Sequence, residues 1–250
     1  MEQISLLSRI EDLSEKCSKT ASLTHTHFLT PAEQSFLKNR SLIAPADGST
    51  MFIGGSNDYE RAVLFFLPYY METEYFDWNE YICIIKATCR FGSPGHRDYL
   101  GALIGLGIRR EFIGDIWIFD EDTYIFCLRT VKDTIIRDFK EVGKYNIKTQ
   151  EVFPSDLPDM VRSFKPIRFT VSSPRLDAVV SGAFRISRAE ASRMILSGKV
   201  NLNYSECIKT DTQIHEGDII SLKGHGKSLI DSFDGTSHRG RIFINVKIYK

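Results

Sequence analysis

The sequence has no long apolar run and no paired cysteines, and each absence excludes a class of protein. The longest apolar run, residues 62–67, is far shorter than the about 20 residues that a membrane-spanning helix needs. The amino terminus lacks a basic region that leads into an apolar run, so we expect no secretory signal. These absences predict a cytoplasmic protein without a membrane partner.

Cysteine usage excludes a disulfide framework. Five cysteines are scattered over 250 residues, and no two of them are spaced as Cys-x-x-Cys. Free thiols in a reducing cytosol fit this pattern better than disulfides or a zinc site. His25 and His27 have no acidic or Cys ligand near them, so we interpret them as part of a loop before a helix. We expect no metal and no other cofactor.

The chain has no net charge, but its charges are unevenly distributed. Residues 1–72 carry 6 Lys+Arg and 9 Asp+Glu, residues 73–165 carry 13 and 15, and residues 166–250 carry 13 and 8. The positive excess is therefore confined to the last segment. A basic binding face on an otherwise neutral protein would produce this asymmetry, which favours nucleic acid as the partner.

The pattern predicts an α+β protein in three parts, of which residues 1–72 are mostly helical. Apolar residues recur at helical spacing from Ile4 to Leu13, and the four residues from Thr30 to Glu33 form a helix start. We expect helices over residues 1–43, then a strand end and turn over residues 52–56. Residues 62–68 are predicted to form a buried strand that Pro68 ends.

Residues 73–165 predict a β-α-β-β-α-β domain, the ferredoxin-like or RRM-like order. Such a sheet often binds single-stranded RNA through exposed aromatics, but the sequence has no clear aromatic signature of that kind. A free sheet face could equally dock a protein. Three prolines bracket a polar segment, residues 155–165, which we predict to be a linker. The expected elements are strands at 81–90, 115–119, 124–128 and 147–153 and helices at 96–106 and 131–142.

Residues 166–250 predict a small α+β module. A helix is expected over residues 175–182, and Ser187 with Glu190 forms a capping box for a second helix that ends at Gly198. Short strands are expected at 200–202 and 219–222, followed by a flexible basic loop at 223–227. We predict that one edge of this module binds RNA through Arg175, Arg185, Ser187, Arg188, Arg193, Lys199, Lys223, His225 and Lys227.

Chemistry supports this reading of the basic residues. Lys and Arg can neutralise phosphates, and Arg can also read or stack on bases. The ordinary alternative for each residue is a solvated surface cation. Gly224 and Gly226 lack the spacing and the strand-to-helix context of a phosphate-binding fingerprint, so a nucleotide loop is not expected.

A second basic group lies in the middle segment. His96, Arg97 and Asp98 occupy a predicted helix start, and Arg109 and Arg110 precede a strand, where they could meet phosphate or a partner. A catalytic His-Asp pair is conceivable. No nucleophile or Gly-rich phosphate loop accompanies it, so structural or RNA-docking use is preferred.

The carboxy-terminal motifs resemble the alpha-L RNA-binding domain, the family named after the fourth protein of the small ribosomal subunit. Arg175-Leu176-Asp177, then Ser187-Arg188, then Gly198-Lys199-Val200, then residues 223–227 follow one another in the order typical of that family, and the resemblance covers about residues 168–230. It implies that these basic positions line the RNA face. Tyr204 departs from the pattern, because many members have a small residue there.

The remaining motifs resemble the YlmH-like proteins. They lie at residues 95–111 and 113–116, with Phe52-Ile53-Gly54-Gly55 and residues 67–70 upstream. This resemblance covers nearly the whole chain. It implies a bacterial cytoplasmic protein with an RRM-like domain ahead of the alpha-L domain. The alpha-L domain also implies kinship with factors that act on obstructed large ribosomal subunits carrying peptidyl-tRNA.

Together these features predict a monomeric, non-enzymatic protein that binds structured RNA. The expected RNA is rRNA, tRNA or both on the large ribosomal subunit, in translation quality control or rescue. The alternative is an RNA-modifying enzyme of the pseudouridine synthase or methyltransferase accessory type, because alpha-L domains are often appended to such enzymes. The sequence has no Rossmann-type glycine fingerprint for a methyl donor. The region before the module is also too short for a synthase fold.

Overall fold

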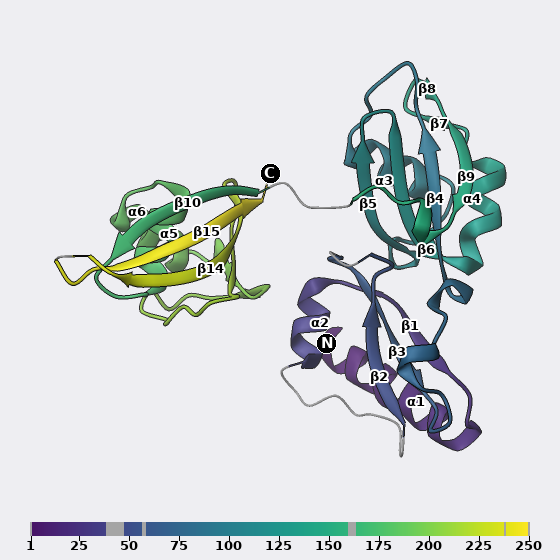
Figure 1. The fold of residues 1–250 in the computed structure, drawn as a ribbon, viewed down its shortest axis with the longest axis horizontal. Coiled ribbons are helices and arrows are strands. Elements are labelled where there is room, and N and C mark those ends of the chain that lie inside the picture. The colour runs from purple at the N-terminus through teal and green to yellow at the C-terminus, as the bar shows by residue number, and fades with distance from the viewer. Residues whose placement is uncertain (1, 39–47, 57–58, 160–163, 238, 250) are drawn as a thin grey trace. The chain divides into compact units, whose positions relative to one another are not determined.

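A computed structural model describes residues 2–38, 48–56, 59–159, 164–237 and 239–249. The chain forms two compact units, residues 1–160 and 161–250 (Figure 1). Both combine helices with antiparallel sheets, so the predicted α+β class is confirmed. Residues 39–43 of the predicted helical region and residues 160–163 of the predicted linker lie outside the described residues. No helix in the described ranges is long and apolar enough to cross a membrane.

The first unit begins with two helices on a three-stranded sheet of order β1-β3-β2. Residues of one face of α1 pack on the buried strand β3, and Thr30 and Glu33 form the predicted capping box at α2. The elements are α1 (Glu2–Thr20), β1 (Thr24–Leu29), α2 (Pro31–Lys38), β2 (Ser49–Ile53) and β3 (Ala62–Leu67).

Strand β1 corrects the prediction that residues 1–43 are helical, and with it the mostly helical description of residues 1–72. His25 and His27 lie within this strand and not in a loop. The first four residues of its sequence, THTHFL, alternate between buried and half-buried positions with the period of two that a strand requires. Strand β3 is buried at every position and needs an antiparallel neighbour on each side, and β1 pairs with it from Thr24↔Phe66 to Leu29↔Ala62.

The middle of the first unit is a four-stranded antiparallel sheet of order β5-β6-β4-β9. Helices α3 and α4 contribute Tyr99, Leu103 and Ile135 to the core on one face of this sheet. The elements occur in the predicted order: β4 (Ile82–Thr88), α3 (His96–Gly105), β5 (Ile113–Phe119), β6 (Asp122–Leu128), α4 (Lys132–Asp138) and β9 (Lys148–Val152). Short 3-10 turns are η1 (Thr73–Tyr75), η2 (Trp78–Glu80), η3 (Arg110–Phe112), η4 (Arg129–Val131) and η5 (Pro154–Asp156).

Helix α4 is shorter than predicted. It ends at Asp138, because the next residues form a small hairpin of β7 (Glu141–Val142) and β8 (Tyr145–Asn146). Gly143 turns this hairpin with a φ of +60°, a conformation that glycine adopts without steric cost.

The sequence had suggested that the second face of the middle sheet is free, but the structure shows that it is covered. It packs against the β1-β3-β2 sheet in one continuous apolar core. Gly55 and Gly114 permit this approach, because a Cβ at Gly55 would lie 2.5 Å from Phe126 Cδ1 and one at Gly114 would lie 2.6 Å from Phe28 Cε1. The buried members are Phe28, Val63, Phe65 and Leu67 from β1 and β3, with Ile82, Ile84, Tyr124, Phe126, Leu128 and Val152 from the middle sheet.

Polar groups at this joint between the sheets are satisfied by two side chains. The guanidinium of Arg61 donates to the carbonyl oxygens of Ile113, at 3.1 Å, and Phe28, at 2.9 Å. The carboxylate of Asp115 accepts the backbone amides of Glu60 and Arg61 at 2.6 and 3.1 Å. Burial lowers the pKa of Arg61.

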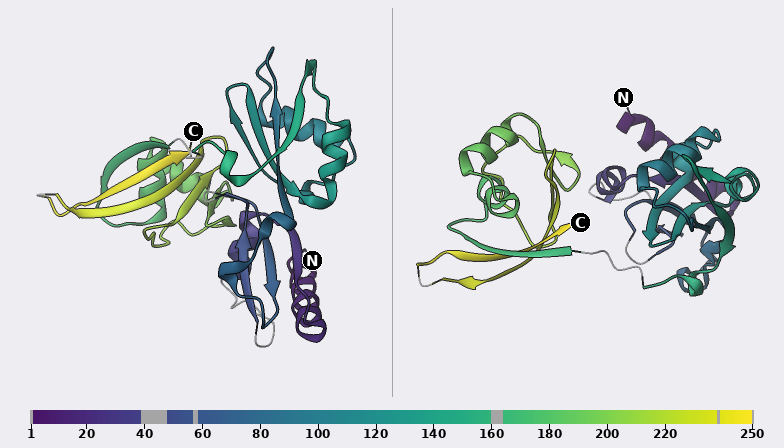
Figure 2. Two further views of the ribbon diagram at one scale, coloured as in Figure 1. Left: turned by 45° about the vertical axis from the view of Figure 1, so that its right-hand side comes forward. Right: turned by 90° about the horizontal axis from the view of Figure 1, so that it is seen from above.

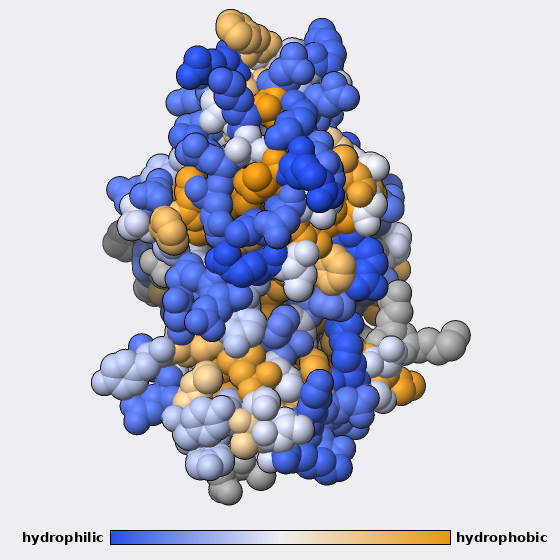
Figure 3. Space-filling model, turned by 90° about the vertical axis from the view of Figure 1, so that its right-hand side faces the viewer, coloured by the Kyte–Doolittle hydropathy of each residue, from blue (hydrophilic) through white to orange (hydrophobic). Residues whose placement is uncertain are grey.

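On the face of this unit drawn in Figure 3, hydrophobic side chains show in separate groups between polar ones.

The second unit is a six-stranded antiparallel sheet with two helices on one side (Figure 2). The strand order is β10-β15-β14-β13-β11-β12. The core joins Leu176, Val179 and Ile195 of the helices to the sheet. The elements are β10 (Phe164–Val171), α5 (Leu176–Phe184), α6 (Arg188–Leu196), β11 (Val200–Leu202), β12 (Ser205–Glu206), β13 (Ile219–Leu222), β14 (Gly226–Thr236) and β15 (Ile242–Tyr249). The sequence predicted both helices and the strands β11 and β13, but missed the other strands.

We predict that Arg61→Met destabilises the first unit by about 2–4 kcal/mol, because it removes two hydrogen bonds from a charged donor to buried carbonyl oxygens. Urea unfolding followed by tryptophan fluorescence measures this, since both tryptophans, Trp78 and Trp117, lie in that unit. Arg97→Met is the matched control, because Arg97 is exposed on α3, and it should change the free energy of unfolding by less than about 0.5 kcal/mol. Equal losses in the two variants would contradict the role given to Arg61.

Candidate RNA interface

A buried carboxylate in the first turn of α5 holds two of the predicted RNA-binding arginines. The side chain of Asp177 is 7% exposed. Arg188 Nε donates to it at 3.0 Å and Arg188 Nη2 at 3.3 Å, while Arg175 Nε lies 3.4 Å away. The side chains of Arg188 and Arg175 remain 54% and 38% exposed. Both guanidiniums are therefore fixed on one side and present N–H groups to solvent on the other.

The short connection between the helices presents further predicted residues. Arg185 ends α5 in the left-handed conformation, with a φ of +56°, and its side chain is exposed. Ser187 then caps α6, accepting the amide of Glu190 at 3.1 Å as the capping pattern predicts. The hydroxyl oxygen of Ser187 thus organises the helix start that carries Arg188.

The segment 223–227 is an ordered hairpin turn and not a flexible loop. Leu222 pairs with Gly226, and the amide of His225 donates to the carbonyl of Leu222 at 2.9 Å. The amide of Lys223 donates to the carbonyl of Lys199 at 2.9 Å, which brings these two lysines together. The His225 ring lies 6.4 Å from that of Phe184, the neighbour of Arg185. The turn therefore adjoins the end of α5.

Lys227 lies in strand β14, opposite Ser221, and is half-buried. Its Nζ is 4.4 Å from the ring centroid of Tyr249 and 5.6 Å from that of Tyr204. Tyr204, the departure noted in the sequence, has a φ of +67° in the turn between β11 and β12. That conformation explains why a small residue is common there. In this chain the tyrosine covers Lys227 instead.

Arg193 is exposed in the last turn of α6. It follows Arg188 by five residues, which places it about 140° further round the helix. Among the described residues, no contact joins it to the arginines held by Asp177. It therefore lies apart from that pair.

The middle domain places its basic residues in different settings. His96 and Arg97 are exposed at the start of α3, where Asp98 accepts the amide of Gly95 at 2.8 Å. Arg109 is 61% exposed, with its guanidinium carbon 4.4 Å from the ring centroid of Phe112. The next residue, Arg110, lies in η3 and donates to carbonyls at the start of the following strand, β5. Burial together with the charge of Arg61 lowers its pKa to about 10.

The sequence reasoning missed an aromatic group on the middle sheet. Trp117 and Phe119 alternate along β5, are half-buried, and have nearly parallel rings with centroids 6.4 Å apart. Tyr124 of the neighbouring strand β6 has its ring centroid 6.1 Å from that of Phe119. Lys86 Nζ lies 6.0 Å from the Tyr124 ring centroid and 2.7 Å from Asp122 Oδ2. The alternation Trp-x-Phe is the sequence pattern from which this aromatic group could have been predicted.

The described residues contain no cluster of His, Cys, Asp and Glu that could hold a metal ion.

Comparisons with known proteins agree with these features. Residues 74–156 match the family described as "Putative RNA-binding domain in YlmH". The chain is 28% identical over 216 residues to the ribosome-associated protein quality control protein P2 of Bacillus subtilis (strain 168), and the alignment covers 86% of this chain and 83% of that protein. Its fold is similar to that of the cell division protein ylmH from Streptococcus pneumoniae, with a TM-score of 0.54 at 18% identity over 64% of this chain and 96% of the other. Residues 74–156 are therefore similar to the RNA-binding domain described for YlmH, and most of the chain aligns with the Bacillus relative.

Proposed function

We propose that this chain is a non-enzymatic RNA-binding factor of ribosome-associated quality control. It docks on rRNA, tRNA or both at the large ribosomal subunit, in the bacterial cytoplasm. The name of the Bacillus relative supports a role in ribosome-associated quality control. The description of the matched domain supports RNA binding. The observation that best supports this proposal is the arrangement at Asp177, which holds Arg175 and Arg188 in fixed positions while part of each arginine side chain stays exposed.

The physical argument rests on preorganisation. A free arginine loses much side-chain entropy when it binds a phosphate, and a guanidinium already held by a carboxylate loses less. Arg185, Lys199 and Lys223 add exposed positive charge within the same unit. We propose that these residues form the main RNA surface, in an alpha-L domain over residues 166–250. Arg193, Ser187 and His225 are proposed as further contacts, and Lys227 as a support for the hairpin turn.

The middle domain is proposed to be RRM-like, over residues 73–165, behind an amino-terminal part of residues 1–72. The strand order β5-β6-β4-β9 supports this. Because one face of its sheet packs on β1 and β3, we place its RNA or partner contacts elsewhere, at His96, Arg97 and Arg109. Arg110 is left out, because its guanidinium donates to carbonyls of β5.

We predict that the double variant Arg188→Glu with Lys223→Glu loses ribosome association. Each lost phosphate contact should also lower the slope of log affinity against log salt by about one unit. Co-sedimentation with large subunits, and filter binding of an RNA hairpin between low and moderate salt, measure the two effects. The double variant Arg239→Glu with Lys247→Glu changes the charge of the same unit equally and should bind like wild type. Unchanged association of the first variant would overturn this RNA surface.

We predict that Asp177→Asn weakens RNA binding about three- to tenfold, although it makes the protein more positive, because the charge-assisted bonds that hold the two arginines are weakened. Fluorescence anisotropy with an RNA hairpin at fixed salt measures this. Asp231→Asn raises the charge equally, and since Asp231 pairs with Lys247, it should leave affinity unchanged or slightly tighter. An affinity of Asp177→Asn equal to or tighter than wild type would show that charge alone governs binding.

A further inference from the structure

The segment between β3 and β4 has a charge pattern that RNA binding does not explain. Between Arg61 and Lys86 the chain contains no Lys or Arg, but it contains four acids, Glu72, Glu74, Asp77 and Glu80. All four are exposed. Within the described part of the chain, no cation forms an ion pair with Glu72, Glu74 or Glu80.

The same segment exposes aromatic side chains. Tyr69, Tyr70 and Tyr75 are 70%, 58% and 81% exposed. A single exposed tyrosine is ordinary, but three within seven residues form a patch of the kind found at interfaces. The rings of Tyr69 and Tyr70 meet edge to face at 5.5 Å, and the Tyr70 hydroxyl donates to the carbonyl of Ala21 at 3.0 Å.

Neighbouring side chains fix this segment in place. The ring of Phe76 lies 4.9 Å from that of Phe65 and 5.8 Å from that of Tyr81, within the apolar core of the unit. Asp77 accepts the amide of Asn79 at 3.0 Å and so caps η2. The outward tyrosines and acids are therefore carried on a backbone that is already ordered, which reduces the entropy lost when a partner binds.

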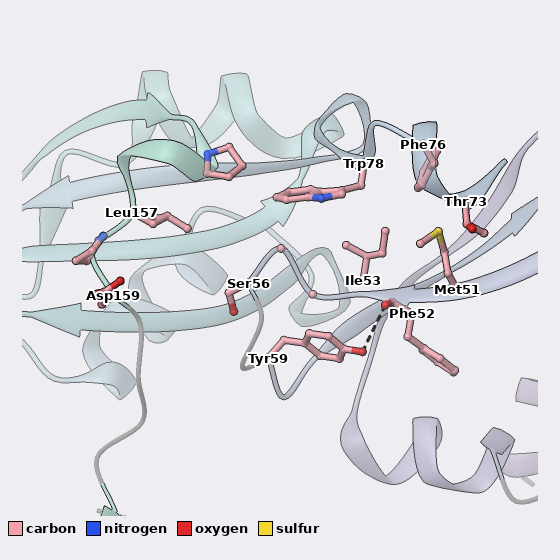
Figure 4. A pocket seen from close by; sticks show the side chains of 14 residues that line it. Met51, Phe52, Ile53, Ser56, Tyr59, Thr73, Phe76, Trp78, Leu157 and Asp159 are labelled. Atoms are coloured by element: carbon pink, nitrogen blue, oxygen red, sulfur yellow. Dashed lines mark hydrogen bonds between the residues drawn. The ribbon is translucent and has the colours of Figure 1, made fainter. Parts of the chain in front are cut away.

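Two hollows adjoin the segment and share Thr73. One is a cavity of about 600 Å³ in which the Trp78 indole and the Tyr59 ring lie on opposite sides (Figure 4). The other, of about 390 Å³, is lined by Tyr69, Met71 and Glu74 among others. They offer space for side chains on both sides of the acidic segment.

We propose that this acidic aromatic surface, formed by residues 69–80 and the two hollows, docks an arginine- and lysine-rich polypeptide segment of a partner protein. Carboxylates pair with its cations, and guanidinium groups stack on exposed tyrosine faces. Charge complementarity decides between the partner classes, because four carboxylates repel RNA phosphate. This surface therefore recognises protein, while the basic unit of residues 161–250 recognises RNA.

The test uses the full chain and a fluorescein-labelled peptide of twelve residues with alternating arginine and glycine, followed by anisotropy. We expect Glu72→Gln with Glu74→Gln, and separately Tyr69→Ala with Tyr75→Ala, to weaken binding about three- to tenfold each. The control is Glu11→Gln with Asp12→Asn, which removes two exposed charges from α1 in the same unit and should stay within about twofold of wild type. The lysine counterpart of the peptide should bind more weakly than the arginine peptide, because an ammonium does not stack as a planar guanidinium does.

Three results would overturn the proposal. The first is equal binding by the acid variant and its control, which would show that only net charge attracts the peptide. The second is displacement of the peptide by a single-stranded RNA, which would make the surface an RNA site. The third is a wild-type dimer in light scattering that the acid variant dissociates, which would make the occupant a second copy of this chain. The readout does not depend on ribosome binding, so it stands apart from the proposed function.

Discussion

The packing of the amino-terminal sheet on the middle sheet is the constraint on which the first unit depends. A four-stranded sheet with helices on one face has a second apolar face that must be covered or used, and here β1 and β3 cover it. Arg61 and Asp115 satisfy the backbone groups where the sheets meet. Because this face is used internally, it is not available to RNA or to a protein partner.

The elements of the middle domain could be predicted because their signals are local. The hydrophobic period changes from strand to helix, and Gly107 marks the end of α3. Strand β1 could not be found in this way. It is short and alternates Thr with His, and its partner Phe66 lies 42 positions after Thr24. The packing of one sheet on the other also could not be predicted from local sequence patterns. It depends on contacts between residues far apart in the chain, such as Gly55 and Phe126.

The arrangement of the proposed RNA surface could be predicted to a similar degree. Arg175 and Arg188 were expected from their motifs, but the clamp by Asp177 depends on how α5 and α6 meet, which no local pattern gives. Lys227 was expected in a mobile loop because glycines surround it. Strand pairing and two tyrosines from elsewhere in the chain hold it instead. Arg110 was predicted to contact RNA or a partner, but its guanidinium donates to backbone carbonyls of β5, which the sequence pattern does not reveal.

The shared carboxylate at the start of α5 has a consequence for how this surface can change. Residues that share one partner are energetically coupled, and their individual contributions do not add. The contributions of Arg175, Asp177 and Arg188 to RNA binding should therefore be coupled. Loss of the acid releases both arginines, and loss of one arginine changes how strongly the acid holds the other. Substitutions of the outer lysines, which do not contact this carboxylate, should therefore have more independent effects than substitutions at these three positions.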